Sequence, residues 1–389
     1  MNEKNILRHE KSKPRKVKKE KKSGKVQSFF KALLIILIIA ALTIGGAYLY
    51  KILMPETSVS EEEQHMIYSP AESIESVSFK NSFIINTIDG IKILNKKGEE
   101  INDEVTNMVS PYVKGMKEPV FCTNDKTVLI FDIAGKTAVL FNEAGIIGSY
   151  NFTGNIISGK MSESGHFVIV VEDAGSKAAV KAYSEAGVEL LTWYSGKGYV
   201  ADATIHNSKK RMAIVTNEIE NGEISSKILL FVLDNSEPYM GKIISNSFCT
   251  AVSFYNDSVY ALCENGLYYV NKEDDIELIH SFSGEKMKHF RFFDNGNVLL
   301  ISENSVEENY RGVVINTKGK KISDFSVDSF LDISDVDKNK FLVIKRKGVL
   351  SINHKGKIKE EIPCQFEVKD AKYFKDKIAV LSQDKIIFE

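Results

Sequence analysis

Short apolar stretches separated by polar turns recur through the chain after about residue 74. The segment 160–193, "KMSESGHFVIVVEDAGSKAAVKAYSEAGVELLTW", shows the pattern, because Gly165, Gly175 and Gly187 interrupt it at intervals of about ten residues. Val, Ile, Phe and Tyr favour a half-buried, pleated backbone, whereas Gly, Asn and Asp accept the dihedral angles of tight turns. Each such segment therefore predicts a group of short antiparallel strands.

Eight copies of this pattern follow one another, and the eighth ends at Glu389. The first turn recurs about every 42 residues between Phe79 and Tyr373, which is the period of a four-stranded propeller blade. The sequence predicts an all-β protein, a β-propeller of eight four-stranded blades. Seven blades is the alternative, if the weaker fourth or seventh copy is irregular. No sustained helical period with caps is recognised after residue 65, so an α/β fold is not expected.

The last copy supplies only three strands, and an open propeller would leave a strand edge exposed. The segment "HMIYSPAES", residues 65–73, lies just before the first copy. We predict that it forms the missing outer strand of the last blade and closes the ring between the N- and C-terminal strands.

The N-terminal region differs sharply from the repeats. Residues 1–31 hold 12 Lys and Arg and only 3 acidic residues, and residues 32–50 hold no charge at all between Lys31 and Lys51. As a helix these 19 residues would be about 28 Å long, close to the hydrocarbon thickness of a bilayer. We predict a single-pass transmembrane helix in the cytoplasmic membrane, with the N-terminus inside and the C-terminal domain outside. A cleaved signal peptide ending near Gly45 and a buried soluble helix are the alternatives.

The predicted organisation is a disordered basic cytoplasmic tail (1–31), the transmembrane helix (32–50), a polar linker (51–64) and an extracytoplasmic propeller domain (65–389). The tail is interpreted as a topology signal near anionic lipid headgroups. A binding arm for nucleic acid or a cytoplasmic partner is the alternative. Because no aromatic residue interrupts the basic run from Arg8 to Lys25, we expect no nucleic-acid partner.

The order of strands and turns resembles WD-repeat and quinoprotein-type propellers. Together with the basic tail and the single span, it is similar to an uncharacterised family of bacterial membrane-anchored propellers. The resemblance covers about 320 residues and is one of pattern. No Gly-His…Trp-Asp pair occurs, and the single Trp193 excludes the repeated tryptophan motif of quinoproteins. The resemblance therefore implies a fold and carries over no catalytic residues.

No motif in the sequence selects a catalytic or metal centre. The seven histidines are scattered, and none has a second ligand at zinc spacing. The segment 335–340, "DVDKNK", imitates the start of a calcium loop but lacks its glycine, and Arg346 replaces the bidentate glutamate. A Gly-x-Ser-x-Gly elbow and a phosphate-binding glycine loop are also absent. We expect no catalytic residues, no metal and no cofactor, hence a protein that is not an enzyme.

Four cysteines are present, and only Cys249 and Cys263 are close in sequence, on either side of the turn at "FYNDS". With a three-residue loop they would lie opposite each other, whereas with a two-residue loop they would point to opposite faces. Buried free thiols are the default expectation, and a disulfide is the alternative.

The function predicted from these features is that of a non-catalytic scaffold in the cell envelope, which binds a protein partner or a ligand. The alternative is an envelope enzyme on a quinoprotein-like propeller. Polar side chains at the mouth of the central channel discriminate between them. Converging carboxylates or histidines would favour the enzyme, and an aromatic rim without them would favour binding.

A binding face is expected where the connections between blades and the turns between second and third strands emerge. The long segments 107–119, 193–199, 217–225 and 303–312 are all predicted to lie on it. Aromatic residues and arginine are enriched at binding hot spots. The candidate binding residues are Tyr112, Trp193, Tyr194, Tyr199, Tyr310 and Arg311. The alternative is that these are tolerated surface loops and that the tyrosines pack locally.

Overall fold

The computed structural model describes residues 66–389, except 68–70, 72, 96, 102–103, 208–209, 236, 271–274, 283, 294, 305–308, 338 and 375–376. The predicted tail, transmembrane helix and linker (1–64) lie outside the described residues. Within the described part, no helix is long and apolar enough to cross a membrane. The chain divides into two units, Met1–Glu62 and Glu63–Glu389, and all the described strands belong to the second unit.

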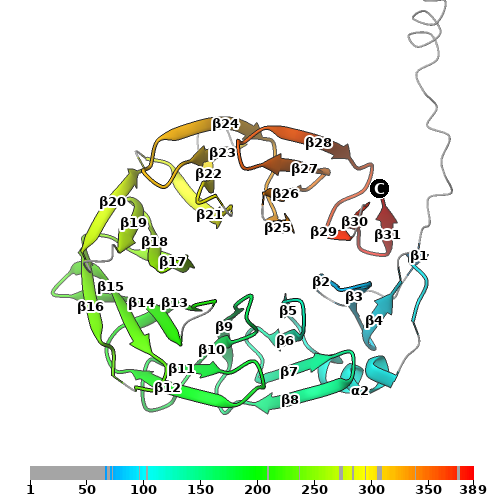
Figure 1. Cartoon of the computed structure of the whole chain (residues 1–389), viewed down its shortest axis with the longest axis horizontal. Helices are drawn as coiled ribbons and strands as arrows, with labels where there is room; N and C mark the ends of the chain where they lie inside the picture. The colour runs from blue at the N-terminus through cyan, green and yellow to red at the C-terminus, as the bar shows by residue number, and fades with distance from the viewer. Residues whose placement is uncertain are drawn as a thin grey trace, which may run out of the picture. The chain divides into compact units, whose positions relative to one another are not determined.

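Eight antiparallel sheets are arranged around a central axis (Figure 1). In most blades the four strands follow one another in sequence order from the axis to the rim. This is the predicted all-β propeller, and the eight-blade prediction is confirmed. The seven-blade alternative is wrong, because the fourth and seventh copies each form a complete four-stranded sheet.

The first four blades extend from β2 to β16. Blade one contains β2 (Ser76–Phe79), β3 (Ser82–Thr87) and β4 (Gly90–Leu94), followed by the helix α2 (Glu104–Val113). Blade two contains β5 (Pro119–Thr123), β6 (Val128–Asp132), β7 (Thr137–Asn142) and β8 (Gly145–Asn151). Blade three contains β9 (Ile156–Met161), β10 (Phe167–Val171), β11 (Ala178–Tyr183) and β12 (Glu189–Ser195). Blade four contains β13 (Tyr199–Ile205), β14 (Arg211–Glu220), β15 (Glu223–Val232) and β16 (Met240–Ser245).

The last four blades complete the ring. Blade five contains β17 (Cys249–Tyr255), β18 (Ser258–Cys263), β19 (Gly266–Val270) and β20 (Ile276–Ser281). Blade six contains β21 (Lys286–Phe292), β22 (Val298–Asn304), β23 (Asn309–Ile315) and β24 (Lys321–Val327). Blade seven contains β25 (Asp332–Asp337), β26 (Lys340–Lys345), β27 (Gly348–Asn353) and β28 (Ile358–Pro363). Blade eight contains β29 (Asp370–Phe374), β30 (Lys377–Leu381), β31 (Lys385–Phe388) and β1 (Met66–Ile67).

The ring closes as the sequence predicts. The N-terminal strand β1 pairs antiparallel with β31, the last strand of the chain, in the register Met66↔Ile386 and Ile67↔Lys385. The two ends of the propeller unit therefore share blade eight (Figure 1).

Blade one departs from the prediction. Its fourth strand, expected at "EEINDEV", is reduced to an isolated bridge between Leu94 and Glu100, and the helix α2 follows instead. The expectation of no helix after residue 65 is therefore wrong. Val105, Val109 and Val113 are buried at a helical spacing, but β-branched residues and Pro111 within the segment conceal that period in the sequence.

The helix α2 covers the edge of β4 that a fourth strand would have covered. The amide of Ile91 donates to Ser110 Oγ at 3.2 Å, and Ser110 Oγ lies 3.4 Å from the carbonyl oxygen of Ile91. The Ser110 hydroxyl thus replaces the backbone groups of a fourth strand as the hydrogen-bond partner of Ile91. Such a partner is needed because backbone groups that are removed from water must be hydrogen-bonded. Gly90 makes this approach available, because a Cβ there would lie 2.3 Å from Ser110 Cβ.

The hydrophobic core is divided into clusters between neighbouring blades. One cluster joins Val168 and Val180 of blade three to Ile214 and Phe231 of blade four. Each blade buries both faces against its neighbours, which explains the continuous apolar second strands such as β10, all of whose residues are buried.

Cys249 and Cys263 form a disulfide, so the default expectation of free thiols is wrong for this pair. The turn between them has two residues, because Tyr255 pairs with Ser258. A register shift between Cys249 and Ala251 then brings Cys249 opposite Cys263. A β-bulge adds one residue to a strand and moves side chains from one face to the other. Cys122 and Cys364 are free.

Candidate functional site at the mouth of the central channel

The innermost strand of each blade faces the central axis (Figure 1). Positions on each innermost strand can be counted backwards from the turn that leads to the second strand. The pairing of these two strands then shows which residues of different blades are equivalent. Asp202, Asp332 and Asp370 are equivalent, since they pair with Val215, Ile344 and Leu381 on the second strands. Asp332 and Asp370 are the first residues of β25 and β29, whereas Asp202 lies in the middle of β13.

Glu75 and His289 occupy the same position in blades one and six, opposite Asn86 and Ile301. We call Glu75, Asp202, Asp332 and Asp370 the carboxylate ring. Two residues further along the innermost strands lie three cations, which we call the cation ring: Lys160, Arg291 and Lys372, with Cys122 at the equivalent position of blade two.

Two members of the carboxylate ring bind neighbouring blades together. Asp370 Oδ2 accepts from the amide of Ser76 at 3.0 Å and from Ser76 Oγ at 2.7 Å, across the seam between blades eight and one. Asp370 Oδ1 also accepts from Lys372 Nζ at 2.8 Å. This carboxylate is buried, and the hydrogen bonds from Ser76 and Lys372 satisfy its oxygens and join the two blades, so its role is structural.

Asp202 repeats this arrangement on another side of the ring. Its Oδ2 accepts from the amide of Val252 in blade five at 2.8 Å. The same oxygen forms an ion pair with Lys160 Nζ of blade three, and Lys160 also donates to the carbonyl oxygen of Val252 at 3.1 Å. Asp202 therefore links three consecutive blades.

Glu75 and Asp332 are not used in this way. Burial raises the pKa of Glu75 to about 8, and the negative charges of Asp370 and Asp332 add to this effect, while Lys372 opposes it. The carboxyl group of Glu75 therefore holds its proton near neutral pH. The Asp332 side chain is exposed to solvent, yet the surrounding protein and Asp370 raise its pKa, against Lys372 and Arg291.

Lys372 stands between these carboxyl groups. Burial alone would lower its pKa, but the charges of Asp370 and Glu75 and the hydrogen bond to Asp370 outweigh burial and raise the pKa. One ammonium group thus faces three carboxyl groups from blades one, seven and eight. Burial, together with the charges of Asp370 and Asp332, therefore explains why Glu75 retains its proton.

His289 of blade six and Cys122 of blade two are the other titratable groups near the axis with shifted pKa values. Burial, with the charges of Arg291 and Lys160, lowers the pKa of His289 to about 3, so its imidazole is neutral. His289 Nε2 is buried without a hydrogen-bond partner within the described residues. Burial raises the pKa of Cys122 to about 11, and the charges of Glu75, Lys160 and Arg291 act on it from three other blades. Charges on opposite sides of the axis therefore interact.

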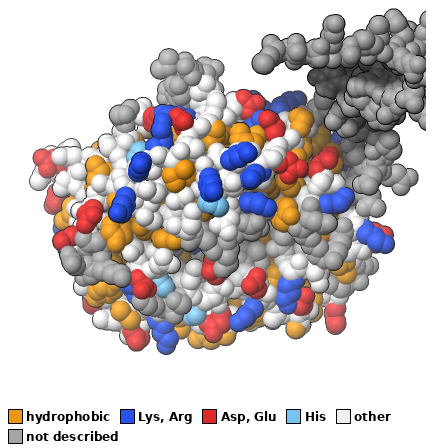
Figure 2. Space-filling model, turned by 45° about the horizontal axis from the view of Figure 1, so that its top comes forward, with side chains coloured by type: hydrophobic (Ala, Val, Ile, Leu, Met, Phe, Trp, Pro, Cys, Tyr) orange, Lys and Arg blue, Asp and Glu red, His pale blue; other side chains and the backbone are white. Residues whose placement is uncertain are grey.

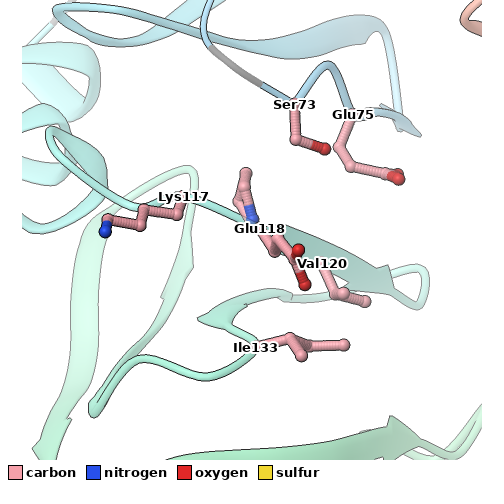
Figure 3. Close-up of a pocket in the computed structure, with 7 residues that line it drawn as sticks. Ser73, Glu75, Lys117, Glu118, Val120 and Ile133 are labelled. Carbon is pink, nitrogen blue, oxygen red and sulfur yellow. The ribbon is translucent and has the colours of Figure 1, made fainter.

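A pocket of about 480 Å³ lies where blades one and two begin. Its lining is Ser73, Glu75, Lys117, Glu118, Pro119, Val120 and Ile133. In Figure 3 Ser73, Glu75 and Glu118 extend toward one side of the pocket and Lys117 extends toward the other. The amides of Lys117 and Glu118 donate to Asp132 Oδ1 at 3.0 and 2.9 Å, which fixes the chain where it enters β5.

The pocket and the carboxylate ring share Glu75, so they form one candidate site at the mouth of the channel. No motif in the sequence marks this site. Glu75, Asp332 and Asp370 are ordinary acidic residues in their own repeats, and only their shared position at the start of the first strand or directly before it distinguishes them. An alignment of the eight copies by their first turns would have shown that position to be rich in carboxylates.

The candidate binding residues chosen from the sequence lie on several blades. Tyr112 is on α2 and is 41% exposed. Tyr194 and Tyr199 are exposed near the connection between blades three and four, where Lys177 Nζ lies over the ring of Tyr199 at 4.7 Å from its centroid. The binding role of these tyrosines stays a prediction.

The other three candidates have local contacts. Trp193 packs edge-on against Phe231 at 5.6 Å, beside the core between blades three and four. Tyr310 packs against Phe330 at 5.7 Å. Arg311 forms ion pairs of 2.7 Å with both Glu285 and Asp324. Their binding role also remains a prediction, although these contacts match the local-packing alternative.

Two of the predicted long loops are regular structure. Segment 107–119 is largely the helix α2, and segment 217–225 is an extension of the hairpin β14–β15. Residues 305–308 of the fourth long segment lie outside the described residues. Figure 2 shows one side of the molecule, on which Lys, Arg, Asp and Glu side chains are interspersed and hydrophobic side chains form small groups.

Within the described residues, no group of three or more His, Cys, Asp or Glu side chains is arranged to hold a metal ion. Carboxylates and His289 nevertheless converge around the channel mouth. Converging carboxylates or histidines are the feature that was expected to favour an enzyme over a binding scaffold.

A family model described as "Family of unknown function (DUF5711)" matches residues 56–387. The chain belongs to this family. No curated protein matches the chain significantly. The expected resemblance to a propeller family is thereby supported at the level of the family and the fold, whereas membrane anchoring and a bacterial origin are not addressed by this match.

Solved structures with the same fold are distant in sequence. The crystal structure of the computationally designed Ika8 protein matches with a TM-score of 0.60 and 13% identity, covering 83% of this chain and 98% of that protein. BamB from Moraxella catarrhalis matches with a TM-score of 0.52 and 9% identity, covering 84% and 98%. KlHsv2 with a replaced loop matches with a TM-score of 0.50 and 11% identity, covering 69% and 89%. These likenesses establish the propeller fold alone.

Proposed function

We propose that this protein is a membrane-anchored scaffold on the outer side of the cytoplasmic membrane, which binds a small polar ligand at the channel mouth without converting it. The observation that carries the proposal is the pocket of about 480 Å³ that opens beside the carboxylate ring. Its volume suits a ligand of the size of a monosaccharide or a short peptide end. In this pocket Glu118 supplies a hydrogen-bond acceptor and protonated Glu75 supplies a donor. Asp332 of the carboxylate ring acts on Glu75 through its charge.

The location outside the cytoplasm rests on two observations. The apolar segment 32–50 follows a strongly basic tail, which favours an anchor with its N-terminus inside. The disulfide Cys249–Cys263 is typical of compartments that are not reducing.

Protease accessibility tests this location. Protease added to cells without their wall is expected to cut the linker near residues 61–63 or the domain at 65–389, and to leave residues 1–31 intact. Loss of an N-terminal tag from intact cells would show the opposite orientation.

Thermal shift measurements on the full chain in detergent test the ligand site. A panel of monosaccharides, amino acids and short peptides is screened against wild type, Glu75→Gln and Asp332→Asn. A ligand of the channel mouth is expected to raise the melting temperature of wild type and to lose at least about tenfold in affinity in a variant. The matched control is Glu264→Gln, an exposed glutamate on another blade. Binding that is equal in all four proteins would place the ligand elsewhere.

The second candidate is an envelope hydrolase, favoured by the raised pKa of Glu75. A carboxyl group that is protonated at neutral pH is suited to act as a general acid. We keep binding as the first proposal because Asp202 and Asp370 are already used to join blades, and because the Cys122 thiol stays protonated. The test is release of reducing ends or amines from cell-wall polymers. An enzyme would lose activity above pH 8 and in Glu75→Gln, whereas a scaffold would release no product at any pH.

A further inference from the structure

The hairpin β14–β15 of blade four extends past its neighbours. Both strands have ten residues, but β13 pairs with β14 only as far as Asn217, and β16 pairs with β15 only from Ser225. The tip turns through Asn221 and Gly222, whose φ angles of 54° and 85° suit a two-residue hairpin turn. Residues 218–223 therefore stand out from the blade, and Ile224 lies at their base, where its carbonyl oxygen accepts from the amide of Asn246 at 2.9 Å.

Two isoleucines lie opposite each other at this tip. Ile219 pairs with Ile224 across the hairpin, and their side chains are 74% and 37% exposed. Side chains alternate between the two faces of a strand, and directly opposed residues share a face. Ile219 therefore shares its face with Asn217, and Ile224 shares the same face with Ser226.

Asn217 and Ser226 identify what that face meets. Asn217 Nδ2 donates to the carbonyl oxygen of Cys249 at 2.9 Å, and the amide of Cys249 donates back to Asn217 Oδ1 at 3.1 Å. Ser226 Oγ donates to the carbonyl oxygen of Ser247 at 2.8 Å. Side chains on this face of the hairpin are therefore hydrogen-bonded to the backbone of Ser247 and Cys249, the two neighbours of Phe248.

Phe248 itself is 42% exposed, although Ser247 and Cys249 on either side are fully buried. The disulfide to Cys263 ties this segment to β18 as well. We call Ile219, Ile224 and Phe248 the hairpin patch. Its apolar side chains are exposed, while the buried polar network and the disulfide beneath keep its backbone rigid. Apolar groups on a rigid base lose little conformational entropy on binding.

The surroundings of the hairpin patch are acidic. Glu220 and Glu223 flank the turn, on the face of the hairpin opposite the two isoleucines. The amide of Glu264 donates to the carbonyl oxygen of Phe248 at 2.9 Å. All three side chains are exposed, and none of them forms an ion pair with another described residue. Uncompensated negative charges therefore lie at the hairpin tip and beside Phe248, and they favour a positively charged partner.

We propose that the hairpin patch docks a protein partner through a segment that presents Lys or Arg beside apolar side chains. The apolar side chains of the partner cover Ile219, Ile224 and Phe248, and its cations pair with Glu220, Glu223 and Glu264. This surface is built from blades four and five, so the inference is independent of the ligand proposed for the channel mouth.

Peptide selection on the full chain in detergent tests the proposal. A random peptide library displayed on phage is panned against wild type, and the enriched peptides are synthesised and titrated. We expect an excess of Lys or Arg next to apolar residues. Ile219→Ser/Ile224→Ser is expected to weaken their binding at least about tenfold, since central apolar anchors dominate interfaces. Glu220→Lys/Glu223→Lys is expected to weaken it by a similar factor and, when panned again, to select acidic peptides.

Two control variants separate specific from general effects. Val188→Ser removes another exposed apolar side chain, and Asp125→Lys/Glu360→Lys reverses two exposed charges elsewhere. Both are expected to bind the peptides as wild type does. Peptides without excess positive charge, or binding that changes less than about twofold in both hairpin variants, would overturn the proposal. Self-association that the isoleucine variant abolishes would also overturn it, because the occupant would then be a second copy. None of these results bears on Glu75.

Discussion

Equivalent positions in the eight repeats carry different chemistry according to their neighbours. Asp370 and Asp202 accept amide hydrogen bonds from the next blade and pair with lysines. Asp332 stands at the same position of blade seven and is exposed. Glu75 faces Asp370 and Asp332 and retains its proton. A carboxyl group at this position therefore joins blades where amide groups and a lysine bond to it, as for Asp202 and Asp370, and has a raised pKa at Glu75 and Asp332.

The pKa of Glu75 predicts how stability depends on pH. The folded pKa of about 8 lies above the ordinary value of 4.5, so between these values the folded state keeps a proton that the unfolded state releases. The free energy of unfolding then falls as pH rises from about 4.5 to 8. Glu75→Gln is expected to flatten this dependence and to stabilise the protein at pH 8 by roughly 1–2 kcal/mol after screening.

Urea unfolding between pH 5 and 9 measures this dependence. Glu118→Gln, at the other glutamate of the pocket, is the matched control and is expected to keep the wild-type slope. An unchanged slope in Glu75→Gln would show that Glu75 is ionised in the folded protein.

At the scale of elements, blade one shows that a propeller edge can be covered without a fourth strand. Helix α2 buries Val105, Val109 and Val113 between blades one and two, and Ser110 occupies the hydrogen-bonding groups of Ile91. The helix therefore replaces an outer strand in two respects: it buries the apolar side chains of the blade, and it supplies hydrogen-bond partners to the backbone of β4.

Replacing the hydroxyl of Ser110 tests the second of these tasks. Ser110→Ala removes the partner of the Ile91 backbone and is expected to lower the free energy of unfolding by about 1–2 kcal/mol. Lys114→Ala, which breaks an exposed ion pair with Asp89, is expected to cost less than about 0.5 kcal/mol. Denaturant midpoints measure both changes, and equal midpoints would mean that Ser110 has no such role.

The disulfide of blade five predicts a second effect at this scale. It closes a loop across a sequence separation of 14 residues, so Cys249→Ala/Cys263→Ala is expected to lower the free energy of unfolding by about 2–3 kcal/mol. Reduction of wild type should give a similar loss, measured by thermal unfolding with and without reductant. Cys364→Ala, at a free cysteine, is the control, and an equal loss there would contradict a specific cross-link.

At the scale of the whole molecule, the ring depends on a small closure. The strand β1 contributes two residues to blade eight, and β31 contributes four. Across the same seam Ser76 bonds Asp370, and Ser78 Oγ donates to the carbonyl oxygen of Tyr373 at 2.6 Å. Loss of one closing strand opens an edge and removes cover from both adjoining blades.

Deletion of residues 385–389 removes β31 and is expected to destabilise the entire propeller, because each blade buries its faces against its neighbours. Deletion of residues 55–59, an equal length in the predicted linker, is expected to leave the melting temperature nearly unchanged. Calorimetry on both variants compares them, and equal melting temperatures would refute closure by β31.

Most of the strands, the eight-blade arrangement and a closing strand within residues 65–73 could be predicted from the sequence. These features rest on local chemistry, since alternating apolar residues and turn residues such as Asn and Gly specify hairpins wherever they occur. A repeat of blade length then leaves few arrangements that bury both faces of every sheet.

The candidate site, the helix of blade one and the disulfide depend on packing in the closed ring. Ser76 and Asp370 are 294 residues apart in sequence, and the ring alone brings blade one to blade eight, so no local pattern marks Glu75 as an acid with a raised pKa. The disulfide depended on a one-residue register shift near Thr250, which strand patterns do not specify. Burial, neighbouring charge and register are properties of packed neighbours, and for that reason they were decided by the closed ring.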